Sequence, residues 1–349
     1  MKLFRPLFDA LSHLANGFFL TFFFCLSVLV GLHLYQNKWE AVKTLPIIWT
    51  LTDAWERGVE NVGGLSAEAV RYFYEKEFRQ VVESSPGKEQ RGKFLLEDGQ
   101  EVRIRSTWSE RRVMEKLQKN GFSEQQIKDA KKFLTYVEKY KALAIRDMMT
   151  YKVPASIKLA QGILESGAGT SELSMNTNNH FGIKARAGEW AQRLIRERRF
   201  EELQDGDFRW VSPAIGAYQM TDDNHYDRFE VYRSVGDSYR RHTQLLTRPC
   251  TAGNVGCYAW IWSAYPVGVK SDIGEAARRS QGRTGYAPGD FFDGKTELPY
   301  YAACAAGLKM SGYATSKTYH QKLAFLIETY ELWRFDLDVM KAYEQLELE

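Results

Sequence analysis

The longest apolar stretch of the chain lies near its start. Between Asp9 and Lys38 there are 28 consecutive residues without Asp, Glu, Lys or Arg, and the centre of this window is almost entirely Phe, Leu, Val and Gly. A helix of about 20 such residues can cross the roughly 30 Å hydrocarbon core of a bilayer. A signal peptide would have a shorter apolar core and a small-x-small cleavage site, which the following residues do not offer. We therefore expect an uncleaved transmembrane anchor at residues 15–36.

The next hundred residues show alternating and helical patterns but no candidate chemistry. Apolar and polar residues alternate over 93–105 around Asp98-Gly99, which predicts a hairpin. A helix is expected over 109–119, and Ser123 with Gln126 predicts a capping box at the start of a longer helix. We interpret residues 37–140 as a stalk or small auxiliary region whose charges lie on solvated helix faces.

A short helix with a carboxylate at its end follows Pro154. Apolar residues recur at helical spacing, and Gly167 and Gly169 predict where the helix stops. Glu165 then lies near the negative end of the helix dipole and beside apolar side chains, and both effects favour its protonated form. A glutamic acid that keeps its proton near neutral pH can protonate a leaving-group oxygen. Spacing alone favours an ordinary surface glutamate at a helix end.

A second hairpin is expected at 217–232, with acidic residues at its turn. Residues 217–221 and 226–232 alternate around Asp222-Asp223-Asn224-His225. His242 follows on a predicted helix, where packing or capping is a more ordinary role than metal binding. The sequence contains no His-Glu-x-x-His or Cys/His cluster, so neither a catalytic metal nor another cofactor is expected.

Composition narrows the class of protein. The chain has 349 residues, enough for about two domains, with 47 Lys and Arg against 44 Asp and Glu. A formal charge of +3 without basic blocks argues against nucleic acid as a partner. With 44% hydrophobic and 26% charged residues, the chain is neither disordered throughout nor a polytopic membrane protein. Cys250 and Cys257 close a short loop and can either form a disulfide in an oxidising compartment or remain free thiols.

Four motifs resemble, in the same order, those of the bacterial glucosaminidases of glycoside hydrolase family 73. They are Gln161-x-x-x-Glu-Ser-Gly-x-Gly-x-Ser171, Asn178-Asn-His-Phe-Gly-Ile-Lys184, Phe229-x-Val-Tyr-x-Ser234 and Gly307-Leu-Lys-x-x-Gly-Tyr-Ala-Thr-x-x-x-Tyr319. The resemblance implies a mainly helical, lysozyme-like α+β fold with a small β-hairpin lobe. It also implies hydrolysis of the β-1,4 bond between N-acetylglucosamine and N-acetylmuramic acid in peptidoglycan, as an endo-β-N-acetylglucosaminidase.

The resemblance also assigns roles to residues. Glu165 is expected to be the general acid, and Ser166 and Ser171 to be structural. Asn179 and Phe181 are expected in substrate binding, with Asn179 also fixing its loop and Phe181 forming one wall of the cleft. Tyr313 and Tyr319 complete the expected substrate-binding set.

The second carboxylate of the reaction is harder to assign. An inverting enzyme needs a base about 6.5–9.5 Å from the acid, and a retaining enzyme needs a nucleophile at about 5–5.5 Å, unless the substrate's acetamido group takes that role. We expect Asp222 or Asp223 at the hairpin turn, with Glu201 and Glu202 in reserve.

Two features depart from the family pattern. Ala168 stands where the family usually has Trp, so the pocket is either wider or filled by another aromatic residue such as Trp190. Residues 248–299 form an apparent insertion that contains Tyr258, Trp260, Trp262 and Tyr265. These rings can form either a glycan subsite wall or a small hydrophobic core under a long loop.

The expected organisation has five parts. Residues 1–14 form a short cytoplasmic start, 15–36 the anchor, 37–140 the stalk, 141–338 the glucosaminidase domain and 339–349 a tail. Charge does not orient the anchor, because Lys and Arg flank both ends. Since peptidoglycan lies outside the cytoplasmic membrane, we expect a single-pass inner-membrane protein with a periplasmic or external body and no protein partner that the sequence identifies. A lytic transglycosylase or muramidase, and a glycan-binding scaffold without turnover, are the alternatives.

Overall fold

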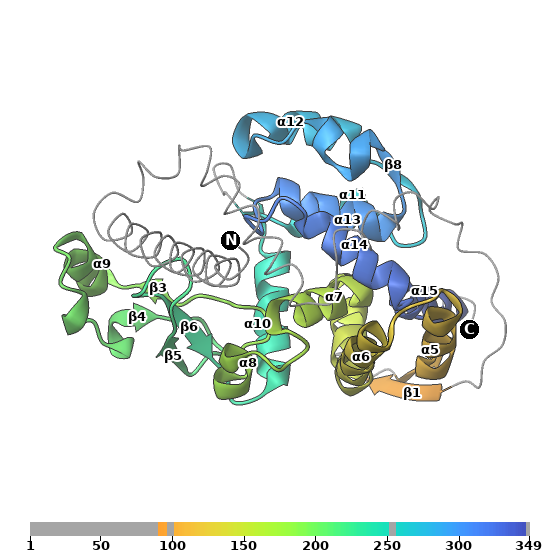
Figure 1. Ribbon diagram of the computed structural model, residues 1–349, viewed down its shortest axis with the longest axis horizontal. Helices are drawn as coiled ribbons and strands as arrows, with labels where there is room; N and C mark the ends of the chain where they lie inside the picture. Colours follow the sequence, from red (N-terminus) through yellow and green to blue (C-terminus); the bar gives the residue numbers. More distant parts are fainter. Residues whose placement is uncertain (1–89, 96–100, 251–255, 347–349) are drawn as a thin grey trace, which may run out of the picture. The chain divides into compact units, whose positions relative to one another are not determined.

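A computed structural model describes residues 90–95, 101–250 and 256–346, all of which lie within one compact unit, Gly63–Glu349. This part of the chain is mainly helical, and its strands form four two-stranded antiparallel sheets (Figure 1). The predicted mainly helical architecture with small β-hairpins is confirmed. The anchor expected at residues 15–36 lies outside the described residues. Within the described ranges, no helix has the length and apolar character that a membrane span requires.

The described part begins with the predicted hairpin and two helices. β1 (Gln90–Leu95) pairs with β2 (Glu101–Ser106). α5 (Glu110–Lys119) and α6 (Glu124–Tyr151) follow, and α6 starts with the expected capping box. The Ser123 hydroxyl accepts a hydrogen bond from the backbone N–H of Gln126, and the Gln126 side-chain oxygen accepts one from the backbone N–H of Ser123. These elements form where local sequence alone predicts them.

The structure does not divide the chain at residue 140. α6 runs through that position without a break, and its buried residues belong to the main hydrophobic core. Thr107 donates to Asp338 at 2.7 Å, and the Trp108 indole donates to the Tyr330 carbonyl at 2.9 Å. Residues 101–140 therefore pack with the helices that follow residue 140 instead of forming a separate stalk, because long-range contacts that no local pattern reports hold them there.

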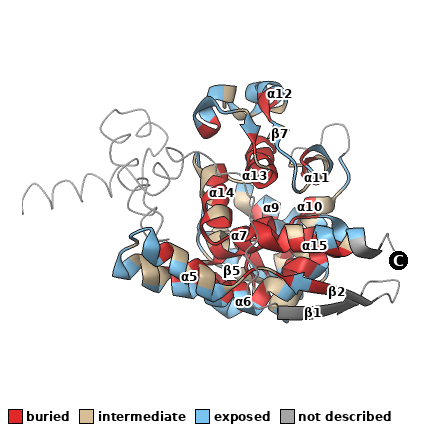
Figure 2. Ribbon diagram, turned by 90° about the vertical axis from the view of Figure 1, so that its right-hand side faces the viewer, coloured by how far each residue is buried: buried red, intermediate tan, exposed pale blue. Residues whose placement is uncertain are grey.

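The centre of the core is made by helices that are apolar on most sides. Every residue of α13 (Tyr300–Met310) is buried (Figure 2). Its run Tyr-Tyr-Ala-Ala-Cys-Ala-Ala places small side chains where neighbouring helices approach. A helix that is apolar all round belongs inside a protein, and α13 contacts both α7 and α14. The core helices after α6 are α7 (Ala155–Ser166), α13 (Tyr300–Met310), α14 (Tyr319–Thr329) and α15 (Trp333–Leu346).

α15 contains most of the expected C-terminal tail and is joined to α7 by hydrogen bonds. Asp336 on α15 is fully buried and accepts hydrogen bonds from the Ser156 amide at 2.9 Å and the Tyr300 hydroxyl at 2.7 Å. Burial raises the pKa of Asp336 to about 6, while these donors act to lower it. One side chain thus joins the starts of α7 and α13 to α15.

A lobe of short strands is inserted between α7 and α10. The predicted hairpin is confirmed, since β5 pairs with β6. Part of the lobe has its own hydrophobic cluster, separate from the main core, around Ala191, Leu194 and Phe208. The elements of the lobe are α8 (Glu172–Thr177), β3 (Arg186–Ala187), α9 (Glu189–Arg196), η2 (Phe200–Glu202), η3 (Asp205–Asp207), β4 (Phe208–Arg209), β5 (Gly216–Gln219) and β6 (Arg228–Val231), and α10 (Val235–Thr247) follows it.

The segment that departs from the family pattern folds against α13. Its strands β7 and β8 pair with each other, which brings the two ends of the intervening chain together. Cys250 and Cys257 form a disulfide near its start. The elements are α11 (Ala259–Ala264), β7 (Ser271–Asp272), α12 (Gly274–Thr284), η4 (Pro288–Asp290), η5 (Phe292–Gly294) and β8 (Glu297–Leu298).

The aromatic residues of this segment are part of the protein interior. Tyr258 and Tyr265 are buried in the main core cluster. Trp260 and Trp262 are half-buried against the same cluster, and their indole nitrogens donate to the Ser311 hydroxyl at 3.0 Å and to a backbone carbonyl at 2.9 Å. Of the two interpretations, the structure favours a hydrophobic core over a glycan subsite wall.

Candidate active site

α7 carries Glu165 on its last turn. The C-cap Gly167 has a left-handed conformation (φ 56°), and Gly169 follows with φ 78°. Glycine adopts this conformation at little cost, and a right-handed helix ends there. The Ser166 hydroxyl donates to the Gly162 carbonyl and accepts a 2.7 Å hydrogen bond from the Gly169 amide. The structural role predicted for Ser166 is confirmed, and the turn that it braces positions Glu165.

Glu165 is a partly buried carboxyl group with a raised pKa. Burial raises its pKa to about 7, and the charge of Asp222 adds to the rise, while a hydrogen bond from the Tyr319 hydroxyl acts in the opposite direction. Loss of solvation prevails, because the part of the chain that the structure describes supplies no cation that lowers this pKa. Near neutral pH a large fraction of Glu165 therefore carries a proton that it can donate.

Tyr319 is buried at the start of α14 and contacts Glu165 directly. Its hydroxyl oxygen lies 3.0 Å from Gln161 Nε2, which donates to it. The hydroxyl can then use its own proton for Glu165. Gln161 and Glu165 are four residues apart on one face of α7. The predicted substrate-binding residue Tyr319 thus belongs to the surroundings of the acid itself.

Tyr313 lies on the loop between α13 and α14, half-buried beside Tyr319. The two rings stack with centroids 5.5 Å apart. Burial raises the pKa of Tyr313 well above its ordinary value, and the charge of Glu165 is the next cause. The loop is held by the buried Lys309 ammonium, which donates to two of its backbone carbonyls at 2.9 and 3.0 Å. Tyr313 and Glu165 therefore face the same site.

Asn179 and Phe181 lie behind the site. Asn179 is 1% exposed, and its amide donates to two backbone carbonyls, both at 2.9 Å, so it fixes its loop as expected. Phe181 is also buried, and its ring stacks on the His242 imidazole with centroids 3.8 Å apart. His242 Nε2 lies 3.0 Å from the Tyr313 hydroxyl. Where the sequence predicts a cleft wall at Phe181, the structure shows a packing contact beneath Tyr313.

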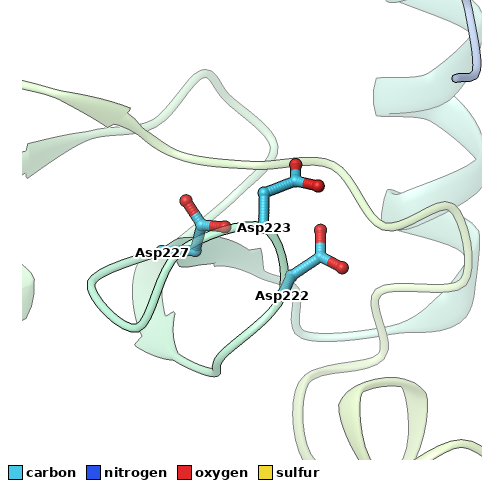
Figure 3. A group of neighbouring side chains, drawn as sticks. All are labelled: Asp222, Asp223 and Asp227. Carbon is cyan, nitrogen blue, oxygen red and sulfur yellow. The ribbon is translucent and has the colours of Figure 1, made fainter. Parts of the chain in front are cut away.

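The carboxylates of Asp222, Asp223 and Asp227 lie close together at the connection between β5 and β6 (Figure 3). The Lys184 ammonium lies 2.9 Å from Asp222, 2.6 Å from Asp223 and 2.9 Å from Asp227. Three such side chains can bind a metal ion, but here a lysine ammonium already lies among them. Asp222 and Asp223, the two candidates for the second carboxylate, thus share Lys184 as their partner. Of the two, Asp222 is the one whose charge raises the pKa of Glu165.

The reserve acids lie on the surface of the lobe. Glu202, on η2, forms an ion pair with Arg199 at 2.6 Å, and Glu201 is exposed beside it. Neither is among the groups whose charge affects the pKa of Glu165. The geometry therefore favours Asp222 over this pair.

Ala168, where the family usually has Trp, is buried in the main core with a left-handed backbone (φ 58°). Trp190 is 48% exposed on α9, where it contacts the Arg193 guanidinium at 5.6 Å from the ring centroid. Trp190 is not among the residues that pack against the core cluster containing Ala168. The structure therefore does not place Trp190 where it could replace the Trp that the family usually has at the position of Ala168.

Lys158 and Gln161 are two buried polar residues of α7 that lie near the site, and no role was predicted for either of them. Lys158 and Gln161 are fully buried on a helix whose other residues from Ala155 to Ile163 are also buried. Together with Glu165 they recur at i, i+3 and i+7, which places them on one face of the helix. A lysine within the buried stripe of a short helix was the signal available in the sequence.

Comparison with protein families gives a match over more than half of the chain. Residues 141–332 match the family model Glucosaminidase, described as mannosyl-glycoprotein endo-beta-N-acetylglucosaminidase. The exo-glucosaminidase LytG of Bacillus subtilis (strain 168) is 26% identical over 187 residues, which cover 53% of this chain and 47% of the relative. The chain thus spans about half the length of this curated relative.

Similar solved structures include the catalytic domain of the autolysin Auto from Listeria monocytogenes, with 20% identity and a TM-score of 0.33 over 62% of this chain and 98% of that one. A type VI secretion system effector-immunity complex from Pseudomonas protegens has 17% identity and a TM-score of 0.33, covering 57% of this chain and 92% of the matched chain.

Proposed function

The chain belongs to the glucosaminidase family of glycoside hydrolases, and from this premise we propose that it cleaves the β-1,4 bond between N-acetylglucosamine and N-acetylmuramic acid in peptidoglycan. Glu165 is the general acid of this reaction. The observation that carries the proposal is the state of Glu165, whose pKa is raised to about 7 at the end of α7. An acid held in this way donates its proton to the glycosidic oxygen as the bond to the sugar breaks.

Asp222 is the second carboxylate of the proposed reaction. It lies at the turn of the β5–β6 hairpin, is more than half exposed, and acts on Glu165 through its charge. The ion pair with Lys184 at 2.9 Å restrains a side chain that would otherwise move freely at the tip of a turn. This arrangement supports a role for Asp222 opposite the acid, on the lobe side of the substrate.

Analysis of the digestion products tests the proposed reaction. Full-length protein incubated with purified peptidoglycan sacculi is expected to release fragments with N-acetylglucosamine at the reducing end, which mass spectrometry identifies after borohydride reduction. Anhydro-muramic ends would instead indicate a lytic transglycosylase, and reducing-end muramic acid would indicate a muramidase. Sacculus binding without any new ends would indicate a scaffold that has lost turnover. Each of these three outcomes contradicts the proposal.

We also propose that residues 15–36 anchor the protein in the cytoplasmic membrane with its body on the outer side. The support is the uncharged window in the sequence together with a substrate that lies outside the membrane. A reporter that is active only outside the cytoplasm is expected to be active when fused after Leu346. Activity of a reporter that works only in the cytoplasm, at the same position, would contradict this orientation.

A further inference from the structure

Lys158 is a fully buried lysine whose charge the proposed reaction does not use. It is 0% exposed, and its ammonium lies about 5 Å from the ring centroids of Phe181 and Tyr239. Burial lowers its pKa to about 8, while Asp147, at 3.2 Å, favours the charged form. The side chain therefore remains mainly an ammonium at pH 7, although it lies in the interior.

The Lys158 ammonium faces one nitrogen of the His242 imidazole. The distance from Nζ to Nδ1 is 3.2 Å, and the other close acceptors are the Tyr239 carbonyl and the Thr243 hydroxyl, both at 2.8 Å, and the Asp147 carboxylate at 3.2 Å. An ammonium can only donate, so the imidazole nitrogen that faces it must present its lone pair. His242 is itself fully buried, and burial, followed by the charge of Lys158, holds its pKa well below the ordinary range. A neutral ring with an unprotonated Nδ1 carries its hydrogen on Nε2.

The protonated nitrogen of His242 is the one that meets Tyr313. Nε2 lies 3.0 Å from the Tyr313 hydroxyl oxygen, so the imidazole donates and the tyrosine accepts. The hydroxyl proton of Tyr313 is then free to point away from His242. The other groups whose charge acts on the Tyr313 hydroxyl are Glu165, at the site, and the buried Tyr258. With the other imidazole tautomer, Tyr313 would have to donate to His242 and could only accept from a ligand.

We propose that Lys158 and His242 form a buried positioning pair that fixes Tyr313 as a hydrogen-bond donor toward an oxygen of the bound sugar. The pair acts through Tyr313 and contacts no substrate, and the inference rests on the proposed function. Phe181 supports it, since its ring stacks flat on the imidazole at 3.8 Å with an interplanar angle of 10° and leaves the ring no room to turn over. The motif residue Phe181 thereby has a function beneath the site.

A double-mutant cycle tests the coupling between His242 and Tyr313. His242→Leu removes the donor and is expected to lower kcat on peptidoglycan by about 10- to 100-fold, with KM changed by less than about threefold, a range typical of lost outer-shell support. In a Tyr313→Phe background the same change is expected to cost less than about threefold, because there is no hydroxyl left to orient. His242→Gln, which can keep an N–H near the position of Nε2, is expected to recover most of the activity.

The controls separate positioning from stability. His320→Gln replaces another buried histidine, for which the described residues provide no hydrogen-bond partner, and is expected to retain near wild-type kcat. Thermal unfolding of every variant shows whether each still folds. If His242→Leu lowered kcat by the same factor in the wild-type and the Tyr313→Phe backgrounds, the proposal would be overturned.

The tautomer itself is measured on wild-type protein, and the measurement does not require activity. In 15N-histidine-labelled full-length protein at pH 7, long-range 1H–15N spectra are expected to show His242 protonated at Nε2 only, with the signal assigned from its absence in His242→Gln. Protonation at Nδ1 would overturn the proposal. This result does not depend on turnover, so failure of the positioning pair and failure of the glycosidase assignment can be told apart.

Discussion

Replacing Glu165 with Gln is expected to lower the rate of peptidoglycan cleavage by about 10³-fold, within the range that general acid catalysis contributes. The amide has nearly the same shape and can still accept a hydrogen bond from Tyr319, but it has no proton to give to the glycosidic oxygen. The measurement is the rate of reducing-end formation on purified sacculi. Binding to sacculi, measured by co-sedimentation, is expected to remain within about threefold of wild type.

Glu172→Gln provides the matched control for this substitution. Glu172 is an exposed glutamate in the first turn of α8, seven residues from Glu165. Its replacement by Gln makes the same chemical change at a position outside the site. It is expected to retain wild-type activity. If Glu165→Gln kept more than about a tenth of the wild-type rate, Glu165 would not be the general acid.

The raised pKa of Glu165 has a consequence for activity and another for stability. Activity is expected to fall about tenfold per pH unit above pH 7, because the acid loses its proton. The folded-state pKa of about 7 exceeds the ordinary value of 4.5, so the contribution of the neutral carboxyl to stability is complete below pH 4.5 and is lost as pH rises through 7. Denaturant unfolding is therefore expected to show that Glu165→Gln gains stability relative to wild type between pH 5 and pH 8.5.

The second large effect is expected at the hairpin turn. Asp222→Asn should lower the rate by about 100-fold or more, because it removes the carboxylate that we propose as the second catalytic group, whose charge also raises the pKa of Glu165. The substitution should also lower the pKa of Glu165, since a negative charge that raises it is lost. The pH at which activity begins to fall is then expected to move downward, which a pH–rate profile of the residual activity would show.

Asp223→Asn is the matched control because it makes the same change one residue away. Asp223 shares the Lys184 partner, at 2.6 Å, and is even more exposed, but its charge is not among those that act on Glu165. It is expected to change the rate by less than about threefold. Equal losses for both substitutions would mean that the acidic turn acts only through its contact with Lys184, and Asp222 would lose its assigned role.

Local sequence predicted the elements that position the acid. The capping box of α6, the glycines that end α7 and the two hairpins all depend on residues within a few positions of each other, so their patterns could be recognised along the chain. The same local view predicted the boundary at residue 140 and left the aromatic rings of 248–299 open to two interpretations. Both questions depend on packing against distant helices, which periodicity does not report.

The sequence by itself determined that a carboxyl group ends a short buried helix and that this helix belongs to a glucosaminidase-like chain. Only the tertiary structure showed that the charge of Asp222 raises the pKa of Glu165, and that Phe181 packs beneath Tyr313. The contacts that join Lys158 to His242, His242 to Tyr313 and Gln161 to Tyr319 bridge 84, 71 and 158 residues of chain. No local pattern encodes such pairings, because they form only when the packed core brings helices from distant parts of the sequence together.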